Sequence, residues 1–333
     1  MQFDQLKRRA FITLLGGAAA WPLAARAQQP ERMRRIGVLN PFAESDPQVQ
    51  ANVTAFRQAL QKLGWTEGHN VRIDYRWGGA DPGRIRAQAK ELVGLNPDVI
   101  LVSSALALQP LLQETRSIPI VFTQLADPVG AGLIASLARP GGNITGFTVA
   151  EFSTFGKLLE VLKEVAPHVT RVAVVLNPDQ IPQAGMLRAI EAAAPSFRVQ
   201  VTAAGARDAA ELEGAIDQFV REPNGGLIVL PNPVTDGNRG LIIAMAARHR
   251  LPAAYAFRHS VADGGLISYG IDLPDQFRQA ASYVDRILKG EKPSELPVQA
   301  PVKFELVINL RTAKALGLDV PWILQQRADE MLE

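Results

Sequence analysis

Short apolar runs alternate with longer amphipathic stretches along most of the chain, and this alternation constrains the fold more than any other feature of the sequence. Residues 35–40 and 97–104 are predicted to be strands buried on both faces, because apolar side chains fill consecutive positions within them. Between them, Val53, Phe56 and Leu60 recur at helical spacing. Strands and helices in alternation form right-handed βαβ units around a parallel sheet. The sequence therefore predicts an α/β fold.

The same scheme occurs twice, in sets of about 115–120 residues, which is the length of one α/β lobe. Strands are predicted at residues 35–40, 71–77, 97–104, 118–123, 143–148, 172–176, 199–203, 227–230, 253–257 and 266–269. Helices are predicted near residues 49–63, 81–93, 106–114, 184–194, 209–220, 237–249 and 275–288, with a short one that starts at Asp127-Pro128 and stops at Pro140. We expect two doubly wound parallel-sheet lobes.

The tail departs from this pattern, with an alternating strand at residues 302–308, a small helix carrying Ala313 and Leu316, and a last helix from about Pro321. We interpret the tail as crossing back to the first lobe and out again. The predicted domains are a leader at 1–27, lobe 1 at 34–148 plus about 273–300, and lobe 2 at 149–272 plus about 301–333.

The first 27 residues have the organisation of an export signal. Residues 7–9 (Lys-Arg-Arg) precede an apolar segment at 10–20, and residues 25–27 (Ala-Arg-Ala) form a cleavage pattern that leaves Gln28 first. The paired arginines favour a twin-arginine signal over a general secretory one. A membrane anchor is disfavoured, since the apolar run is short and Pro22 interrupts its end. We expect an exported, soluble protein in the periplasm.

The chain contains no cysteine, which excludes disulfides, thiolate metal sites, cysteine nucleophiles and a lipid anchor on an N-terminal cysteine. Without the leader, 31 Lys and Arg stand against 32 Asp and Glu. Nothing in this balance resembles a polyanion-binding surface, so nucleic acid is not an expected partner.

In open parallel sheets, ligands bind beyond the carboxyl ends of the strands. Small hydroxyls, amides, aromatics and a few carboxylates follow the predicted strand ends, without a histidine, and this set is typical of a binding cleft. The candidate ligand-binding residues are Asn40, Phe42, Ser103, Ser104, Ala105, Gln124, Asp127, Asn177, Asn232, Tyr255, Tyr269 and Asp272.

Two of these positions suggest charge recognition, and each has a structural alternative. Residues 103–105 (Ser-Ser-Ala) lie at the predicted start of a helix. The free N–H groups there suit a ligand carboxylate; in the alternative, one of the serines only caps the helix. Asp272 follows a strand at an expected lobe crossover, where it faces a ligand ammonium or caps the next helix. Asp127 is favoured as a helix cap over a ligand contact. Four aromatic side chains have two possible roles, stacking on a flat ligand or packing in the core or at the rim of the cleft: Phe42, Trp77, Tyr255 and Phe257.

Catalytic templates are missing from the sequence: there is no G-x-S-x-G elbow, H-E-x-x-H helix or Walker loop. The histidines stand far apart in the sequence, at His69, His168, His249 and His259. We therefore expect no catalytic residue, no metal and no cofactor.

Several segments together resemble a family of ABC-transporter substrate-binding proteins that includes tryptophan-type binding proteins. They are residues 118–122 (Ile-Pro-Ile-Val-Phe), 127–133 (Asp-Pro-Val-Gly-Ala-Gly-Leu), 137–146 (Leu-Ala-Arg-Pro-Gly-Gly-Asn-Ile-Thr-Gly), 264–270 and 309–317. The resemblance covers essentially the whole chain after the leader.

This resemblance implies a type I periplasmic-binding fold, with two lobes that are joined by three crossovers and close on a small ligand. It places residues 103–105 and the surroundings of Asp127 on the first-lobe face, and Asn177, Asn232 and Asp272 on the second. It implies a protein that captures a small organic ligand and delivers it to an ABC transporter permease; the ligand is an amino acid, with aromatic ones favoured, or a related carboxylate. Because such a shuttle works as a single chain, we expect a monomer. A ligand-sensing module that docks on a membrane receptor and an exported α/β enzyme are the alternatives.

Overall fold

The computed structural model describes residues 33–149 and 152–333, so the predicted leader lies outside the described residues. The first sheet is parallel throughout, with strand order β2-β1-β3-β4-β5. Its strands are β1 (Arg34–Asn40), β2 (Val71–Trp77), β3 (Val99–Ser103), β4 (Ile120–Leu125) and β5 (Ile144–Thr148).

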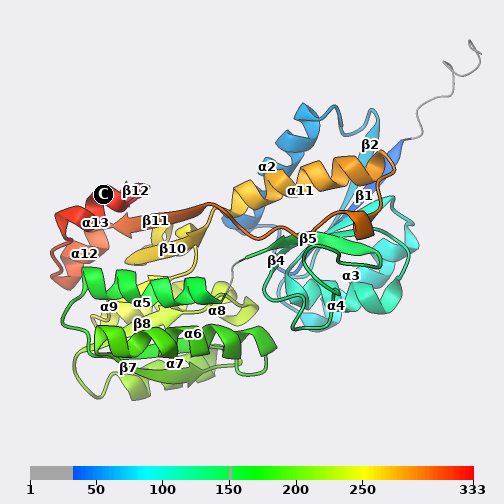
Figure 1. Cartoon of the computed structure of the whole chain (residues 1–333). Helices are drawn as coiled ribbons and strands as arrows, with labels where there is room; N and C mark the ends of the chain where they lie inside the picture. Colours follow the sequence, from blue (N-terminus) through cyan, green and yellow to red (C-terminus); the bar gives the residue numbers. More distant parts are fainter. Residues whose placement is uncertain (1–32, 150–151) are drawn as a thin grey trace, which may run out of the picture.

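Helices cover both faces of this sheet, as the buried runs of its strands require. Their bounds are α2 (Pro47–Lys62), α3 (Pro82–Gly94), α4 (Ser104–Glu114) and α11 (Leu273–Leu288). Helices α2 and α11 lie side by side (Figure 1), and Phe56 and Phe277 pack in one core with β1 and β3. Helices α3 and α4 close the other face, where Ile85 and Leu108 are fully buried.

The second sheet has the order β12-β11-β10-β9-β8-β6-β7. Its strands are β6 (Arg171–Leu176), β7 (Gln200–Gly205), β8 (Gly225–Val229), β9 (Ala253–Tyr255), β10 (Ile267–Ile271), β11 (Phe304–Asn309) and β12 (Glu330–Leu332). The helices around it are α5 (Ser153–Val165), α6 (Ile181–Phe197), α7 (Ala209–Phe219), α8 (Pro233–Gly237), α9 (Arg239–Arg248), α10 (Arg258–Ala262), α12 (Leu310–Leu316) and α13 (Trp322–Arg327). A 3-10 turn, η1 (Pro293–Glu295), lies against β5 of the first sheet.

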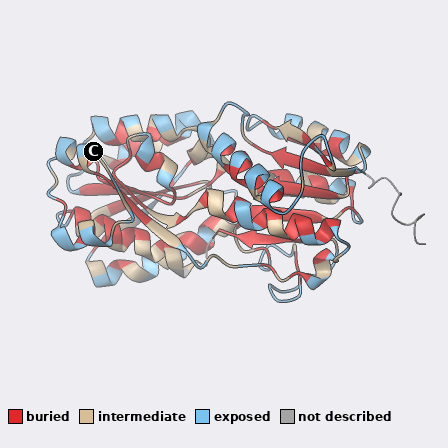
Figure 2. Cartoon of the chain, turned by 90° about the horizontal axis from the view of Figure 1, so that it is seen from above, coloured by how far each residue is buried: buried red, intermediate tan, exposed pale blue. Residues whose placement is uncertain are grey.

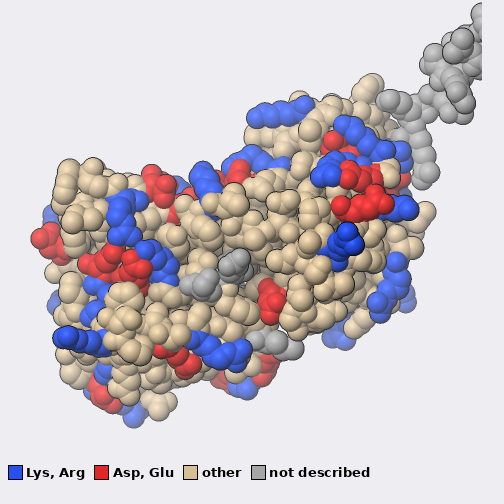
Figure 3. Space-filling model, viewed as in Figure 1, with Lys and Arg blue, Asp and Glu red and all other residues tan. Residues whose placement is uncertain are grey.

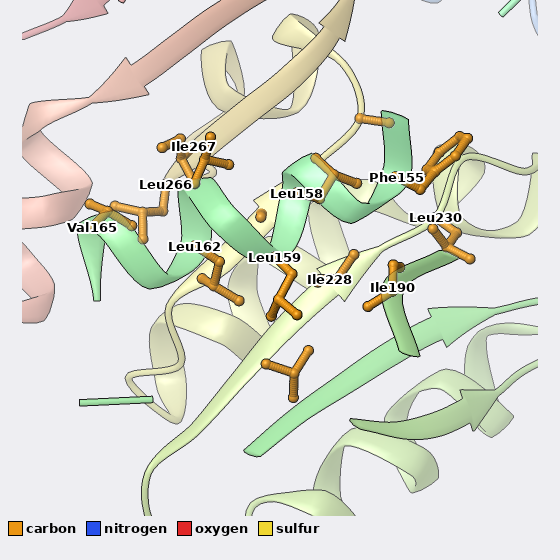
Figure 4. Close-up of a cluster of buried hydrophobic side chains, with 14 of the residues drawn as sticks. Phe155, Leu158, Leu159, Leu162, Val165, Ile190, Ile228, Leu230, Leu266 and Ile267 are labelled. Atoms are coloured by element: carbon orange, nitrogen blue, oxygen red, sulfur yellow. The ribbon is translucent and has the colours of Figure 1, made fainter. Parts of the chain in front are cut away.

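Helix α5 supplies much of the core of the second sheet. Phe155, Leu158, Leu159 and Leu162 recur at helical spacing and point from α5 toward the sheet, where Ile228 of β8 lies (Figure 4). On the opposite face, α7 and α9 pack over the sheet in a separate apolar cluster. Figure 2 shows the result in both halves, with buried strands between helices whose outer faces are exposed.

The chain passes between the two sheets at three places: between β5 and α5, between β10 and α11, and between η1 and β11 (Figure 1). The prediction of two α/β lobes with three crossovers is therefore confirmed. One detail differs from an all-parallel second sheet: β11 returns from the other lobe and pairs antiparallel with β10.

Two sequence predictions about helices need correction. The short helix expected from Asp127 to Pro140 is wrong: the segment is a series of turns, because Asp127 (φ 43°) and Gly132 (φ 68°) take left-handed backbone conformations that end a helix. Helix α5 was not predicted, although its apolar spacing was present in the sequence.

Glycine is required at one point of the first sheet. Gly146 in β5 has φ 152°, and a Cβ there would lie 2.1 Å from the carbonyl oxygen of Phe122 in β4. The two backbones therefore approach each other more closely than any side chain allows.

Both signs of charge are interspersed on the face shown in Figure 3. Within residues 33–149 and 152–333, no helix combines the length and the apolar character needed to cross a membrane.

Candidate functional site

A cavity of about 300 Å³ lies between the two lobes and is walled by residues of both. The first lobe contributes the loop after β1, the start of α2, the start of α4 and the end of β4. The second lobe contributes the starts of α6, α8, α9 and α10. A volume of this size suits one small organic molecule.

Six of the twelve predicted binding residues line this cavity, in agreement with the rule that ligands bind beyond the strand ends. They are Asn40, Phe42, Ser104, Ala105, Gln124 and Asn232. Asn40 is buried at the end of β1, and its Oδ1 accepts the N–H of Phe42 at 2.9 Å, which fixes the loop that carries the Phe42 ring.

The start of α4 presents hydrogen-bond donors to the cavity. Ser103 occupies the N-cap position, but its side chain makes no capping bond to α4. Its buried hydroxyl instead accepts a bond from Thr123 Oγ1 at 3.4 Å. The Oγ of Ser104 is buried without a partner, and Ser104 holds φ at 65°. The uncapped N–H groups and the unpartnered hydroxyl together favour an anionic ligand group.

Gln124 lies beside this helix start, because β4 pairs with β3 up to Ser103 and Thr123, and its backbone is also left-handed (φ 56°). Its N–H donates to Oε1 of Gln276 at 2.9 Å, and Nε2 of Gln276 donates to the carbonyl of Thr148 at 2.9 Å. Gln276 belongs to α11, a helix that the chain forms after it returns from the second lobe. These two hydrogen bonds therefore connect the end of β4 at the cavity to α11.

Asn232 positions the second-lobe wall through a reciprocal cap. Its Oδ1 accepts the N–H groups of Val234 and Thr235, and Thr235 Oγ1 accepts the N–H of Asn232. This capping box starts helix α8 beside the cavity. The helix then places Asp236, one turn further on, in the wall of the cavity.

Asp236 differs from Asp46 and Asp179, the other carboxylates of the cavity, because its carboxyl forms no hydrogen bond or ion pair with a described residue. Burial raises the pKa of Asp236 from 3.8 to about 7, and the nearby charge of Arg239 lowers it only in part. The protonated and ionised forms are therefore close in free energy at neutral pH, and a further positive group beside Asp236 favours the ionised form. Asp236 is an acceptor suited to a ligand ammonium.

Arg239 begins α9 next to Asp236 and joins the two lobes. Its Nη1 donates to Oδ2 of Asp46 at 3.0 Å, and its Nε donates to Asp263. Burial raises the pKa of Asp46, but the hydrogen bond and the charge of Arg239 outweigh this effect and leave that pKa below 3.8. Asp46 is therefore ionised at neutral pH.

The rest of the wall is apolar and aromatic. Phe257 and His259 form a tilted pair, with ring centroids 5.7 Å apart, and Leu106 and Met186 add aliphatic surface. Burial lowers the pKa of His259 from 6.5 to about 4, so this imidazole is neutral and adds a flat surface without a charge. A flat, apolar ligand body matches this lining.

Six predicted binding residues lie elsewhere. Ser103 lies below the surface of the cavity. Asp127 is in a turn, where Oδ1 accepts the N–H of Gly130 at 2.8 Å, rather than at a helix start. Asn177 accepts the N–H of Asp179 in the loop after β6. Tyr255 is buried in the core of the second sheet.

Tyr269 and Asp272 lie near the crossovers. The ring of Tyr269 stacks on Phe304, with centroids 5.7 Å apart. Asp272 caps α11 through the N–H of Asp275 at 2.9 Å and pairs with Arg278 at 3.3 Å. Asp272 is thus a helix cap, which was the alternative to binding a ligand ammonium, and it lies away from the cavity.

The strand-end rule missed several wall residues, because they come one helical turn or more after a strand end. Asp236, Arg239 and His259 are on the short helices of the second lobe, and Asp46 and Gln48 begin α2. The expectation of a site without histidine is corrected by His259. One sequence signal existed: Asn-Pro-Val-Thr at residues 232–235 has the form of a helix start, so the residues of the first turn after it were candidates.

The family model for ABC transporter substrate binding proteins matches residues 35–332. A tyrosine-binding protein of Clostridioides difficile (strain R20291) is 27% identical over 278 residues, which cover 82% of this chain and 78% of that protein. The family and this relative are both binding proteins by description, in agreement with the expectation of a binding protein rather than an enzyme.

Two solved structures share the fold. A domain from Streptococcus pneumoniae in complex with L-Trp has a TM-score of 0.83 at 22% identity, over 90% of this chain and 99% of that chain. The ligand-free, open structure of a substrate-binding protein with adhesive properties from Clostridium difficile has a TM-score of 0.68 at 25% identity, over 90% and 99%. The predicted type I periplasmic-binding fold is therefore confirmed.

Proposed function

Because the chain belongs to the ABC transporter substrate-binding protein family, we propose that it captures an aromatic amino acid between its two lobes and delivers it to an ABC importer. The proposal includes export to the periplasm, where a monomeric, unanchored protein carries the ligand to the permease. The names of the relatives that bind tyrosine and L-Trp support the class of ligand.

One observation carries the assignment of an amino acid. One wall of the cavity, at the start of α4 with the unpartnered hydroxyl of Ser104, suits an anion, and another wall contains the carboxyl of Asp236, which has no hydrogen-bond partner among the described residues. These two walls belong to different lobes. A zwitterion interacts with both at once, whereas a plain carboxylic acid leaves the carboxyl of Asp236 without a hydrogen-bonded cation.

The geometry also supports closure by the ligand. A ligand carboxylate held at α4 and an ammonium held at α8 connect the lobes, so the ligand has a higher affinity for the closed arrangement than for an open one. Aromatic bodies fit the surface formed by Phe42, Phe257 and His259. In this proposal Asp236 takes the ammonium-binding role that the sequence suggested for Asp272.

A thermal-shift screen tests the proposal on protein that has been unfolded and refolded to remove carried ligand. The panel contains aromatic and aliphatic amino acids, aromatic acids without an amine, and nucleosides. Binding to the native state alone stabilises it by about 2.7 kcal/mol at a hundredfold excess over Kd. We expect the largest shift with L-tryptophan, L-tyrosine or L-phenylalanine. A larger shift with the amine-free acids would contradict the assignment.

A further inference from the structure

The ion pair between Asp46 and Arg239 connects the two lobes at the edge of the cavity. Asp46 lies at the start of α2 in the first lobe, and Arg239 at the start of α9 in the second. Oδ2 of Asp46 accepts Nη1 of Arg239 at 3.0 Å. Among the ion pairs of residues 33–149 and 152–333, this is the one that joins the two cavity walls; the others lie within one lobe or on the crossover segments.

Both members of the pair are held in place by other bonds. Oδ1 of Asp46 caps α2 by accepting the N–H groups of Gln48 and Val49, which leaves Oδ2 for the arginine. Arg239 Nε donates to Asp263 within the second lobe. The side chains of Asp46 and Arg239 are only 21% and 19% exposed. A fixed and partly buried pair loses little side-chain entropy when it forms, and salt screens it less than a surface pair.

The lobe arrangement is more similar to that of a ligand-bound binding protein than to that of an open, ligand-free one. Its TM-score is 0.83 against the structure with bound L-Trp and 0.68 against the open, ligand-free one. Because the pair joins residues of different lobes at hydrogen-bond distance, any rotation that opens the cavity separates its two members. The pair therefore belongs to the closed arrangement alone.

We infer that Asp46 and Arg239 form an interlobe clamp, a pair of positioning residues that stabilises the closed arrangement and slows release of the bound ligand. The effect on release rests on the proposed function, whereas the effect on closure does not. Arg239 also donates to the backbone carbonyl of Asp236 at 3.3 Å. The clamp thus contacts the same turn of α8 that carries the proposed ammonium acceptor.

The substitution Asp46→Asn tests the clamp. Asparagine caps a helix as well as aspartate does, so α2 keeps its cap while the pair loses its negative charge. Asp81→Asn is the matched control. Asp81 also caps a helix of the first lobe that has proline at its first position, and its Oδ1 accepts the N–H of Arg84, but it makes no ion pair across the cavity.

Closure is measured on the ligand-free protein by double electron–electron resonance between two spin labels. The chain has no cysteine, so Lys90→Cys in α3 and Gln218→Cys in α7 each accept one spin label at an exposed site on a different lobe. At low salt we expect Asp46→Asn to lower the ratio of closed to open protein about fivefold to tenfold. The Asp81→Asn variant keeps the wild-type ratio. An identical distance distribution in wild type and Asp46→Asn overturns the clamp.

Release is measured by stopped-flow fluorescence with L-tryptophan or L-tyrosine, whichever gives the larger thermal shift. We expect Asp46→Asn to raise the dissociation rate about fivefold to tenfold while the association rate changes little. If neither amino acid binds wild type, the proposed function fails, but the distance measurement still decides the clamp. Unchanged dissociation beside a normal wild-type affinity contradicts the role of the clamp in ligand release.

Discussion

Replacing Asp236 with asparagine should make the empty protein more stable and the binding of ligand weaker. In the folded protein burial raises the pKa of Asp236 from 3.8 to about 7. Folding therefore favours the protonated form, and the folded state loses stability as the pH rises from about 4 to about 7, where the unfolded chain has already released this proton. Above pH 7 the cost is about 4 kcal/mol at most. Asparagine removes it while keeping the shape of the side chain.

Ligand binding should change in the opposite direction. Loss of one partner from a buried charge pair costs about 2–3 kcal/mol, which corresponds to a Kd about 30- to 150-fold higher. The affinity of wild type should also rise about tenfold between pH 6 and pH 8, because the ammonium requires an ionised Asp236. The Asp236→Asn variant should show no such dependence, since His259, whose pKa lies near 4, stays neutral over this range.

Chemical denaturation at pH 5 and pH 8 and calorimetric titration at pH 6 and pH 8 measure both effects. Asp179→Asn is the control, because Asp179 also lines the cavity but is largely exposed and paired with Arg207 at 2.9 Å. A structural role for Asp236 would lower stability and affinity together. A less stable Asp236→Asn protein, or one with unchanged affinity, would refute the reasoning.

Three further substitutions test separate parts of the structure. Ser104→Ala should raise the Kd for the amino acid about tenfold in calorimetric titration, because a hydroxyl bonded to a charged group contributes about 1.5 kcal/mol or more; unchanged affinity would remove the hydroxyl from the anion site. Asp272→Ala should lower the free energy of unfolding by about 1 kcal/mol through loss of the α11 cap, with Kd within about twofold of wild type. Complete loss of binding would show that Asp272, and not Asp236, binds the ligand ammonium. Gly146→Ala should destabilise the first sheet by about 3 kcal/mol or more in urea denaturation, since its Cβ would meet the Phe122 carbonyl; a change below about 1 kcal/mol would show that β4 and β5 separate easily.

Much of the fold was predictable from the sequence, because strands buried on both faces leave an unmistakable apolar run. Strands β1 and β3, for example, lie at the runs of consecutive apolar residues from which they were predicted. The direction of β11 was not predictable from periodicity, since an alternating strand has the same pattern in parallel and antiparallel pairs. Asp127-Pro128 has the form of a helix start, but the glycines that follow favour turns.

The candidate site was predictable only where it lies directly at strand ends. Ser104 and Asn232 follow their strands within a few residues, and both line the cavity. Asp46 and Arg239 come together only because the lobes close on each other, and no local pattern encodes a contact between residues 193 positions apart. Asp272 shows the converse. It follows a strand end, so the strand-end rule included it, but its carboxylate already caps α11 and pairs with Arg278.

The most direct test of the proposed zwitterion site is a calorimetric titration with matched ligands. L-tryptophan is compared with indole-3-propionate, which lacks the ammonium, and with tryptamine, which lacks the carboxylate; L-tyrosine, its deamino acid and tyramine form a second set. If Ser104 and Asp236 hold the two ends of an amino acid, one complete amino acid should bind at least about 30-fold more tightly than both of its truncated analogues. Equal affinity for the acid without the ammonium would contradict the site.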